Sequence, residues 1–403
     1  MKNNKSQKNI PNGWLVRNLS ELATISRGGS PRPIDAYITD KEDGLNWLRI
    51  GDINPGAKYI YKTSQKIREE GLPKTTLVNS GDFILSNSMS FGRPYIMKVD
   101  ACIHDGWLAL REIKTGLIGK DFLYYLLSSE KIQNDFSSIS AGSGVQNLKK
   151  DTVSTVAVKI PPISEQKRIV AVLETWDQVI EKLAEKIKVK KNIKKGLMYA
   201  LLSSGGRAVK LGELCDIGTG KKNNQDKEKN GRYPFFVRSP IVERINSYSF
   251  EGEAILIPGE GDIGKIFHYI NGRFDYHQRV YKISNFKKGI LGKFIYYYLV
   301  KNFAKATKSD SVKATVDSLR LPTFLNFRVN LPAVSKQEQI IEILDTATLD
   351  IELLERKLNM LKGQKKFLLN NLITGQIRVP ECVTAGISDK KTGDKKANDR
   401  QKR

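Results

Sequence analysis

The chain has 403 residues, and its 67 Lys and Arg against 43 Asp and Glu give a formal net charge of +24 at pH 7. This length predicts two or more domains, and the charge favours a polyanionic partner over the alternative of cations scattered for solubility. No run of 18 apolar residues and no signal-peptide core occurs, which argues against a membrane partner and predicts a cytoplasmic protein.

The cysteines and histidines are few and dispersed. They are Cys102, Cys215, Cys382, His104, His268 and His277. No zinc-ligand spacing occurs among them, and isolated cysteines do not make a disulfide framework. We therefore expect neither a metal nor another cofactor.

Residues 1–160 form the first predicted segment, a compact α+β domain. Short β-branched and aromatic runs such as "FILSN" alternate with Gly, Asn and Pro turns. One amphipathic helix is predicted around "YYLL".

Residues 161–205 form the second segment, a long helical spacer that opens with Pro161-Pro162. Apolar residues then recur at the a and d spacing of a coiled coil, which predicts a helix from about Ser164 to Leu202. The predicted seam includes Leu173, Trp176, Ile180, Leu183 and Ile187.

Residues 206–331 repeat the first segment. "LSELATISRG" at Leu19–Gly28 matches "LGELCDIGTG" at Leu211–Gly220. In the same order, "GDFIL" matches "GEAIL" and "IGKDFLYYLL" matches "LGKFIYYYLV". The chain is therefore predicted to contain two copies of one unit.

Residues 332–378 form a second helical spacer, whose opening "LPAVSKQEQI" matches "IPPISEQKRI" of the first. Its predicted seam includes Leu344, Ile351, Leu354, Leu358 and Leu361. Residues 379–403 follow as a basic tail that is predicted to be disordered.

Connectivity predicts how the two helices pair. The first spans about 55 to 60 Å, whereas the joint Ser203–Gly206 reaches only about 13 Å. The second domain is therefore expected at the far end of the first helix, and the second helix must run back to bury its seam. The predicted fold class is α+β, with two tandem α+β domains separated by two long helices that form an antiparallel coiled coil with approximate two-fold symmetry.

Two similar domains on a spacer of fixed length suit a partner with features at a fixed repeat. Duplex DNA has such features about every 34 Å, and two-fold symmetric proteins commonly recognise it. The sequence therefore indicates a protein that recognises two short DNA sequences separated by a gap. Phosphate contacts would set affinity and base-edge contacts would set identity.

The order, spacing and duplication of these motifs resemble the specificity subunit of type I restriction-modification systems, over nearly the whole chain. "PPISEQ" at Pro161–Gln166 is similar to the motif that opens the helical spacers of that family. "PAVSKQ" at Pro332–Gln337 is similar too, although Lys336 stands where Glu is usual. "AGSGVQNLKKDTV", just before the first spacer, adds to the resemblance.

The resemblance implies a subunit without catalysis of its own. It implies that residues 1–160 and 206–331 hold target recognition domains for an asymmetric, bipartite site in double-stranded DNA. It also implies docking of two methyltransferase (modification) subunits and of restriction translocase subunits.

Candidate DNA-binding residues are long or amide side chains in glycine-bearing, loop-like stretches, where binding residues concentrate. In the first copy they are Arg27, Arg32, Asn87, Arg93 and Gln146. In the second copy they are Lys222, Asn223, Lys265, His277 and Arg279.

No catalytic residue is predicted. "GEGDIGKI" at Gly259–Ile266 fits a phosphate-loop spacing, but Ile266 replaces the Ser or Thr that holds Mg²⁺. His104 and His277 lie at equivalent places, yet no Ser, Cys or carboxylate partner repeats beside them. The alternatives are a coiled-coil scaffold carrying two protein-interaction modules and, more weakly, a nucleotide-dependent enzyme built on Gly259 to Lys265.

Overall fold

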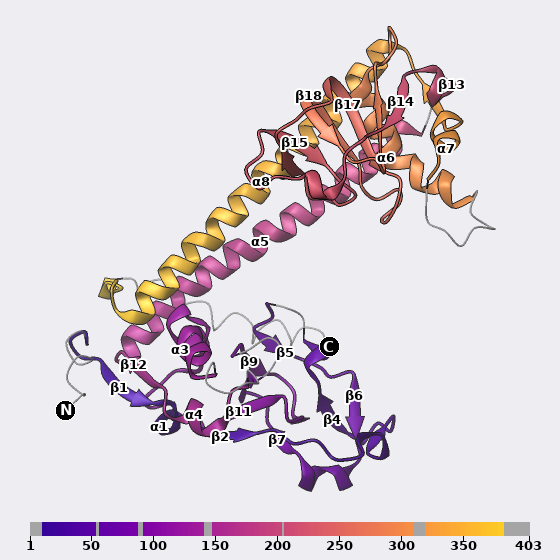
Figure 1. The fold of residues 1–403 in the computed structure, drawn as a ribbon. Coiled ribbons are helices and arrows are strands. Elements are labelled where there is room, and N and C mark those ends of the chain that lie inside the picture. The colour runs from indigo at the N-terminus through magenta and orange to yellow at the C-terminus, as the bar shows by residue number, and fades with distance from the viewer. Residues whose placement is uncertain are drawn as a thin grey trace, which may run out of the picture. The chain divides into compact units, whose positions relative to one another are not determined.

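The computed structural model describes residues 10–53, 56–87, 92–140, 147–203, 205–309 and 319–382 (Figure 1). They divide into two compact units. Unit 1 holds the described part of residues 1–182 and 359–403, and unit 2 holds that of residues 183–358. This division cuts two long helices, α5 (Ile163–Leu202) and α8 (Val334–Thr374), so each unit contains a stretch of both. The predicted segment boundaries, which give each long helix a segment of its own, stay predictions.

Unit 1 is a mixed α+β domain. Its strands are β1 (Leu15–Asn18), β2 (Thr24–Arg27), β3 (Ile38–Thr39), β4 (Leu45–Leu48), β5 (Tyr59–Ile60), β6 (Gln65–Ile67), β7 (Thr76–Val78), β8 (Phe83–Ser86), β9 (Pro94–Met97), β10 (Ala101–Ile103), β11 (Trp107–Arg111) and β12 (Ala157–Ile160). Its other α-helices are α1 (Leu19–Leu22), α2 (Lys120–Ser128), α3 (Glu130–Ser140) and α4 (Lys150–Ser154). The strands form two five-stranded sheets, β3-β6-β4-β10-β7 and β2-β11-β8-β9-β5, and the pair β1-β12.

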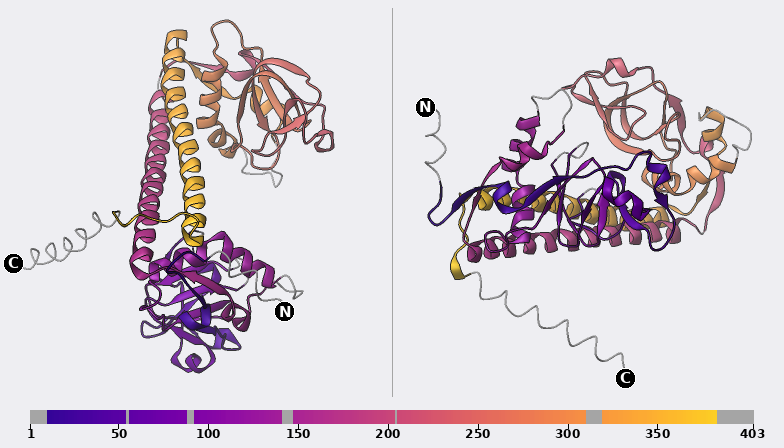
Figure 2. Two further views of the ribbon diagram at one scale, coloured as in Figure 1. Left: turned by 90° about the vertical axis from the view of Figure 1, so that its left-hand side faces the viewer. Right: turned by 90° about the horizontal axis from the view of Figure 1, so that it is seen from below.

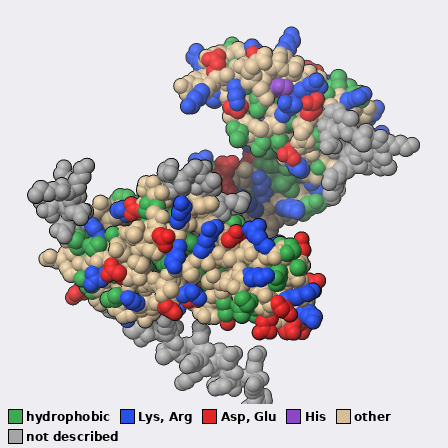
Figure 3. All heavy atoms as spheres, turned by 60° about the horizontal axis from the view of Figure 1, so that its bottom comes forward, with side chains coloured by type: hydrophobic (Ala, Val, Ile, Leu, Met, Phe, Trp, Pro, Cys, Tyr) green, Lys and Arg blue, Asp and Glu red, His purple; other side chains and the backbone are tan. Residues whose placement is uncertain are grey.

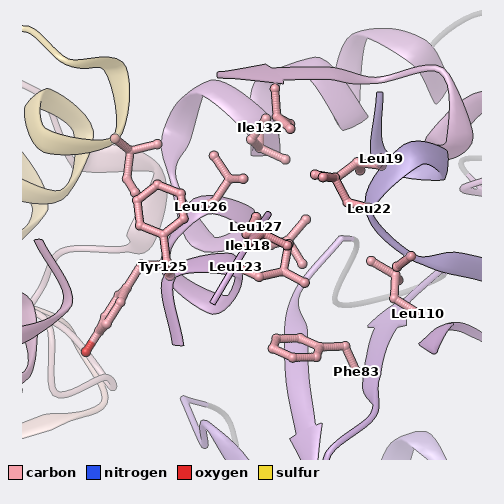
Figure 4. Close-up of a cluster of buried hydrophobic side chains, with 14 of the residues drawn as sticks. Leu19, Leu22, Phe83, Leu110, Ile118, Leu123, Tyr125, Leu126, Leu127 and Ile132 are labelled. Atoms are coloured by element: carbon pink, nitrogen blue, oxygen red, sulfur yellow. The ribbon is translucent and has the colours of Figure 1, made fainter. Parts of the chain in front are cut away.

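The main core of unit 1 lies between α2 and the sheet that contains β8 and β11. Phe83 and Leu110 extend from that sheet, while Leu123 and Leu126 extend from α2 (Figure 4). Leu173 of α5 and Leu372 of α8 belong to the same buried cluster. The amphipathic "YYLL" helix therefore joins the domain to the stretches of both long helices in unit 1.

Unit 2 is built on the same plan. Its strands are β13 (Arg207–Lys210), β14 (Asp216–Thr219), β15 (Tyr233–Phe236), β16 (Glu243–Ile245), β17 (Phe250–Pro258), β18 (His268–Tyr276), β19 (Val280–Ser284) and β20 (Arg328–Leu331), and its other α-helices are α6 (Gly292–Ser309) and α7 (Leu321–Leu325). The order β14-β19-β17-β18-β15-β16 makes one sheet, and β13 pairs with β20 as β1 pairs with β12. In unit 2, α6 lies between this sheet and α8 (Figure 2).

The second sequence match, "GDFIL" with "GEAIL", is wrong by one residue. β8 places Leu85 opposite Leu108 of β11, and β17 places Ile257 opposite Tyr281 of β19. Leu108 and Tyr281 are equivalent because each follows the same turn, so Leu85 corresponds to Ile257 and not to Leu256. A one-residue shift exchanges the two faces of a strand. Phe83 and Leu85 therefore face the core of unit 1, whereas Ile255 and Ile257 face the core of unit 2.

Gln166 fastens the start of α5 to the domain of unit 1. Its side chain is buried, and its Nε2 donates to the carbonyl oxygens of Leu117 and Pro161, both at 2.8 Å. Its Oε1 accepts a hydrogen bond from the backbone N–H of Gly119 at 2.8 Å. Every polar atom of this buried amide side chain therefore has a partner.

Gln337 repeats these contacts at the start of α8 in unit 2. Its Nε2 donates to the carbonyl oxygens of Gly289 at 3.1 Å and Pro332 at 3.0 Å. Its Oε1 accepts from the backbone N–H of Leu291 at 3.0 Å. The glutamine of the repeated sequence motif thus joins each long helix to the loop before the amphipathic helix of its own domain.

Lys336 departs from the first copy because its surroundings differ. Its counterpart Glu165 is buried, accepts from Trp14 Nε1 at 3.1 Å and accepts from both Nε and Nη2 of Arg378, the latter at 2.7 Å. In unit 2 the strand register puts Gly206 in the place of Trp14. Lys336 is exposed, so unit 2 has no buried carboxylate here to neutralise.

The long helices are antiparallel within each unit. In unit 1, Arg168 of α5 contacts Val379 just beyond α8, and Asp177 pairs with Lys365. Moving forward along α5 therefore means moving backward along α8. In unit 2, Lys190 pairs with Asp350 at 2.9 Å, while Leu202 and Ile340 share a buried cluster. The predicted α+β fold with antiparallel long helices is confirmed inside each unit.

None of the ten predicted seam residues of the two long helices is exposed. Leu173, Ile187, Leu344 and Ile351 are buried. The remaining predicted seam residues, Trp176, Ile180, Leu183, Leu354, Leu358 and Leu361, are half-buried.

Candidate nucleic-acid interface

The turn from His104 to Trp107 joins β10 to β11 in unit 1. The backbone N–H of Gly106 donates to His104 Nδ1 at 2.7 Å, and that of Trp107 donates to the His104 carbonyl oxygen at 3.1 Å. Burial lowers the pKa of His104, outweighing the opposite effect of Asp105. The imidazole is therefore neutral at pH 7 and accepts at Nδ1, which fixes the shape of the turn.

Three of the predicted residues meet at this turn. The Asp105 carbonyl oxygen accepts from Arg27 Nε at 3.2 Å and from Asn87 Nδ2 at 2.8 Å. The Asp105 carboxylate accepts from the Ser30 hydroxyl at 3.0 Å and lies 3.6 Å from Arg32 Nη2. Burial by itself raises the pKa of Asp105. The hydrogen bond from Ser30 and the other contacts of the carboxylate lower the pKa by more than burial raises it, so the net shift is downward. Arg27 and Arg32 are exposed, whereas Asn87 is buried.

The turn from His277 to Val280 repeats this arrangement between β18 and β19 of unit 2. The backbone N–H of Arg279 donates to His277 Nδ1 at 2.9 Å. Gln278 Nε2 donates to Asn223 Oδ1 at 2.6 Å, and its backbone N–H donates to the Lys222 carbonyl oxygen at 2.8 Å. The structure thus brings together Lys222, Asn223, His277 and Arg279, of which His277 is buried and Arg279 is exposed.

One glycine in each copy allows a loop to approach this turn. A Cβ on Gly28 would lie 2.1 Å from the carbonyl oxygen of His104, and a Cβ on Gly220 would lie 2.0 Å from that of Tyr276. Both distances are far below contact with a backbone atom. The matched glycines of the two sequence copies are therefore required by the same close approach of backbones.

An open groove lies beside each turn. In unit 1 a groove of ≈ 640 Å³ has Ser30, Arg32, Trp47, Arg49, Gln65 and His104 in its lining. In unit 2 a groove of ≈ 510 Å³ has Gly220, Glu260, Gln278, Arg279 and Arg320 in its lining. Arginine and amide side chains at a groove are the groups that hydrogen-bond to base edges.

The remaining predicted residues lie elsewhere. Arg93 is exposed at the start of β9, where its backbone N–H donates to the Ser86 hydroxyl at 3.1 Å. Lys265 lies in the loop after β17, and its pKa is raised by the hydrogen bond to Asp262, 2.7 Å away. Gln146 lies outside the described residues.

Positive charge is not gathered into one patch on the face shown in Figure 3, where Lys and Arg side chains alternate with Asp and Glu over both units. Within the described ranges, no group of three or more His, Cys, Asp or Glu is placed to hold a metal ion. No helix among the described residues is long and apolar enough to cross a membrane.

Comparison with known proteins decides the family. The sequence model of the family "Type I restriction modification DNA specificity domain" matches residues 11–191 and again 206–363. This chain belongs to that family. Its members are the non-catalytic specificity subunits that recognise DNA in type I restriction-modification systems.

Relatives and solved structures agree with this assignment to the specificity subunits. The specificity subunit of the type I restriction enzyme MjaVIII from Methanocaldococcus jannaschii is 24% identical over 422 residues, covering 92% of this chain and 94% of the relative. The specificity subunit of EcoDI from Escherichia coli is 31% identical over 175 residues, covering 42% of this chain and 38% of the relative. The crystal structure of a type I system S subunit from M. genitalium has the same fold, with a TM-score of 0.55, 17% identity, and coverage of 92% of this chain and 98% of that one.

Several residues of the candidate interface are not evident in the sequence of this specificity subunit. Ser30 and Asp105 organise the turn of unit 1, and Gln278 joins the turn of unit 2 to a distant loop. Arg49 and Glu260 line the grooves. The available signal was position: Asp105 and Gln278 directly follow the two histidines that the internal repeat aligns.

Proposed function

We propose that this specificity subunit recognises an asymmetric, bipartite DNA site, with unit 1 bound to one half and unit 2 to the other. One observation carries the proposal: the two units share a histidine turn, a close-approach glycine and a flanking groove. The side chains on this common frame differ, since Asp105 and Gly106 correspond to Gln278 and Arg279. Two similar frames with different side chains suit two different short sequences.

Direct contacts to DNA come from the exposed members of the predicted set. Arg27, Arg32 and Arg279 are exposed, and arginine forms the commonest specific contact to guanine. Lys222 and Asn223 are half-buried beside the second turn. Asn87 and His277 are buried and act by holding their turns. Arg93, Lys265 and Gln146 are further proposed contacts, with phosphate the expected target of Lys265.

Two methyltransferase subunits dock on the long helices, and restriction translocase subunits join the complex. The support is a set of exposed apolar side chains on the outer faces of α5 and α8. In unit 1 these are Val179, Met360 and Phe367, and in unit 2 they are Val189, Ile193, Leu349 and Leu353. Val189 and Ile193 are four residues apart, as are Leu349 and Leu353, so the two members of each pair lie on one face of their helix. Exposed apolar side chains that share a face are typical of a protein interface.

The test is to express the chain with its methyltransferase and map methylated adenines across the host genome. The expected result is a motif of two short, different sequences separated by a fixed gap. DNA affinity should also fall steeply with salt concentration. Salt-independent binding of a protein without retention of DNA would contradict the proposal and favour a scaffold.

A further inference from the structure

Two arginines of unit 2 share one carboxylate. Arg238 follows β15, Glu260 follows β17 and Arg279 precedes β19. Arg238 Nη1 donates to Glu260 Oε2 at 3.1 Å, and Arg279 Nη1 donates to Glu260 Oε1 at 2.8 Å. These three side chains, named here the Arg-Glu-Arg cluster, connect three loops that are distant in sequence.

Main-chain hydrogen bonds hold those loops in place. The N–H of Gly259 donates to the carbonyl oxygen of Arg279 at 2.8 Å, and the carbonyl oxygen of Gly259 accepts from Leu319 at 2.7 Å. The N–H of His277 donates to the carbonyl oxygen of Phe236 at 2.9 Å. The backbone that carries the cluster is therefore fixed by main-chain hydrogen bonds, and a preorganised recognition site requires such support.

The carboxylate is the more enclosed part of the cluster. The side chain of Glu260 is 28% exposed, against 44% for Arg238 and 58% for Arg279. Grooves of ≈ 340 and ≈ 510 Å³ both include Glu260, the first together with Arg238 and the second together with Arg279. Each groove is thus lined by one of the two arginines together with Glu260, to which that arginine is hydrogen-bonded.

We infer that Glu260 is a positioning residue that directs Arg238 and Arg279 at guanine bases in the half-site bound by unit 2, an inference that rests on the proposed function. Arginine has five N–H donors, so the bond through Nη1 leaves donors for a bidentate contact to guanine O6 and N7. A phosphate is the poorer ligand because Glu260 offsets part of the positive charge and repels an anion. Without the carboxylate, the two guanidinium groups repel each other and lose their fixed directions.

The experiment compares the methylated motifs of complexes that carry wild-type, Glu260→Gln or Glu251→Gln chains. Glu251 is the matched control, because it pairs with Arg273 at 2.9 Å at the opposite end of β17. Binding to duplexes with each base of the second half-site substituted gives the discrimination at each position. For Glu260→Gln we expect guanine discrimination in that half-site to fall about 10-fold, with the first half-site unchanged. Glu251→Gln should match the wild type.

The half-site bound by unit 1 serves as an internal control. If Glu260→Gln keeps wild-type discrimination, or weakens binding equally for all sequences as a phosphate contact would, the inference is overturned. A wild-type second half-site without guanine on either strand also overturns it, while the proposed function stands. A wild-type complex that methylates no bipartite motif overturns both.

Two further variants cover the case in which Glu260→Gln impairs folding of unit 2. Arg238→Lys and Arg279→Lys keep the charge but lose the planar fork. Each should lower guanine discrimination at its own position about 10-fold. Unchanged discrimination in both variants, with the first half-site still recognised, contradicts the inference.

Discussion

Replacing Arg378 by alanine tests how the segment directly after α8 stabilises unit 1. Arg378 donates through Nε and Nη2 to Glu165, whose side chain is only 3% exposed. Trp14 Nε1 would remain the partner of that carboxylate at 3.1 Å. Breaking a buried ion pair costs about 3 to 5 kcal/mol, and because Arg378 is 45% exposed, we expect about 2 kcal/mol.

The assay is urea unfolding followed by tryptophan fluorescence. All four tryptophans lie in unit 1, so the signal reports that unit. The control is Arg68→Ala, an exposed arginine of the same unit, with an expected change within about 0.5 kcal/mol. Adding Glu165→Gln to Arg378→Ala removes the uncompensated charge and should recover part of the loss. An Arg378→Ala chain as stable as the Arg68→Ala chain would refute the reasoning.

Four other perturbations give expected outcomes. Gln166→Ala leaves three backbone groups unpaired and should lower the stability of unit 1 by about 2 kcal/mol or more, while Gln337→Ala should act on unit 2 and appear in its amide hydrogen exchange but not in tryptophan fluorescence. Gly28→Ala puts a Cβ 2.1 Å from a backbone oxygen and should cost unit 1 about 1 to 3 kcal/mol by the same urea assay; an unchanged midpoint would contradict the close approach. Inserting four residues after Lys188 lengthens α5 by about 6 Å, so mapped motifs should show a changed gap or no recognition, and a wild-type gap would contradict the role of the helix as spacer.

The long helices follow from sequence because their signal is local and periodic. The predicted start at Ser164 and end at Leu202 compare with Ile163–Leu202 in the structure. Antiparallel pairing also follows, because the joint after the first helix is too short for another path. The role of Gln166 could not be predicted from the sequence, because its three hydrogen-bond partners are backbone groups. A backbone partner does not depend on which residue type supplies it.

Strand register and the loops of the candidate interface depend on contacts between residues that are distant in sequence. The sequence match of "GDFIL" with "GEAIL" aligned Leu85 with Leu256, whereas the pairing of β8 with β11 and of β17 with β19 aligns Leu85 with Ile257. Asp105 gathers residues from two other loops, and Glu260 joins two arginines from two further loops. The assembled sheet determines which loops lie next to one another. Residue type and glycine content could therefore indicate candidate residues but not which of them lie together.

The most direct test of the two-unit account is the methylated motif of a chain in which residues 207–330 are replaced by a copy of residues 13–159. If each unit recognises one half-site, the mapped motif should contain the first half-site twice and the second not at all. A motif that keeps the wild-type second half-site would contradict the account.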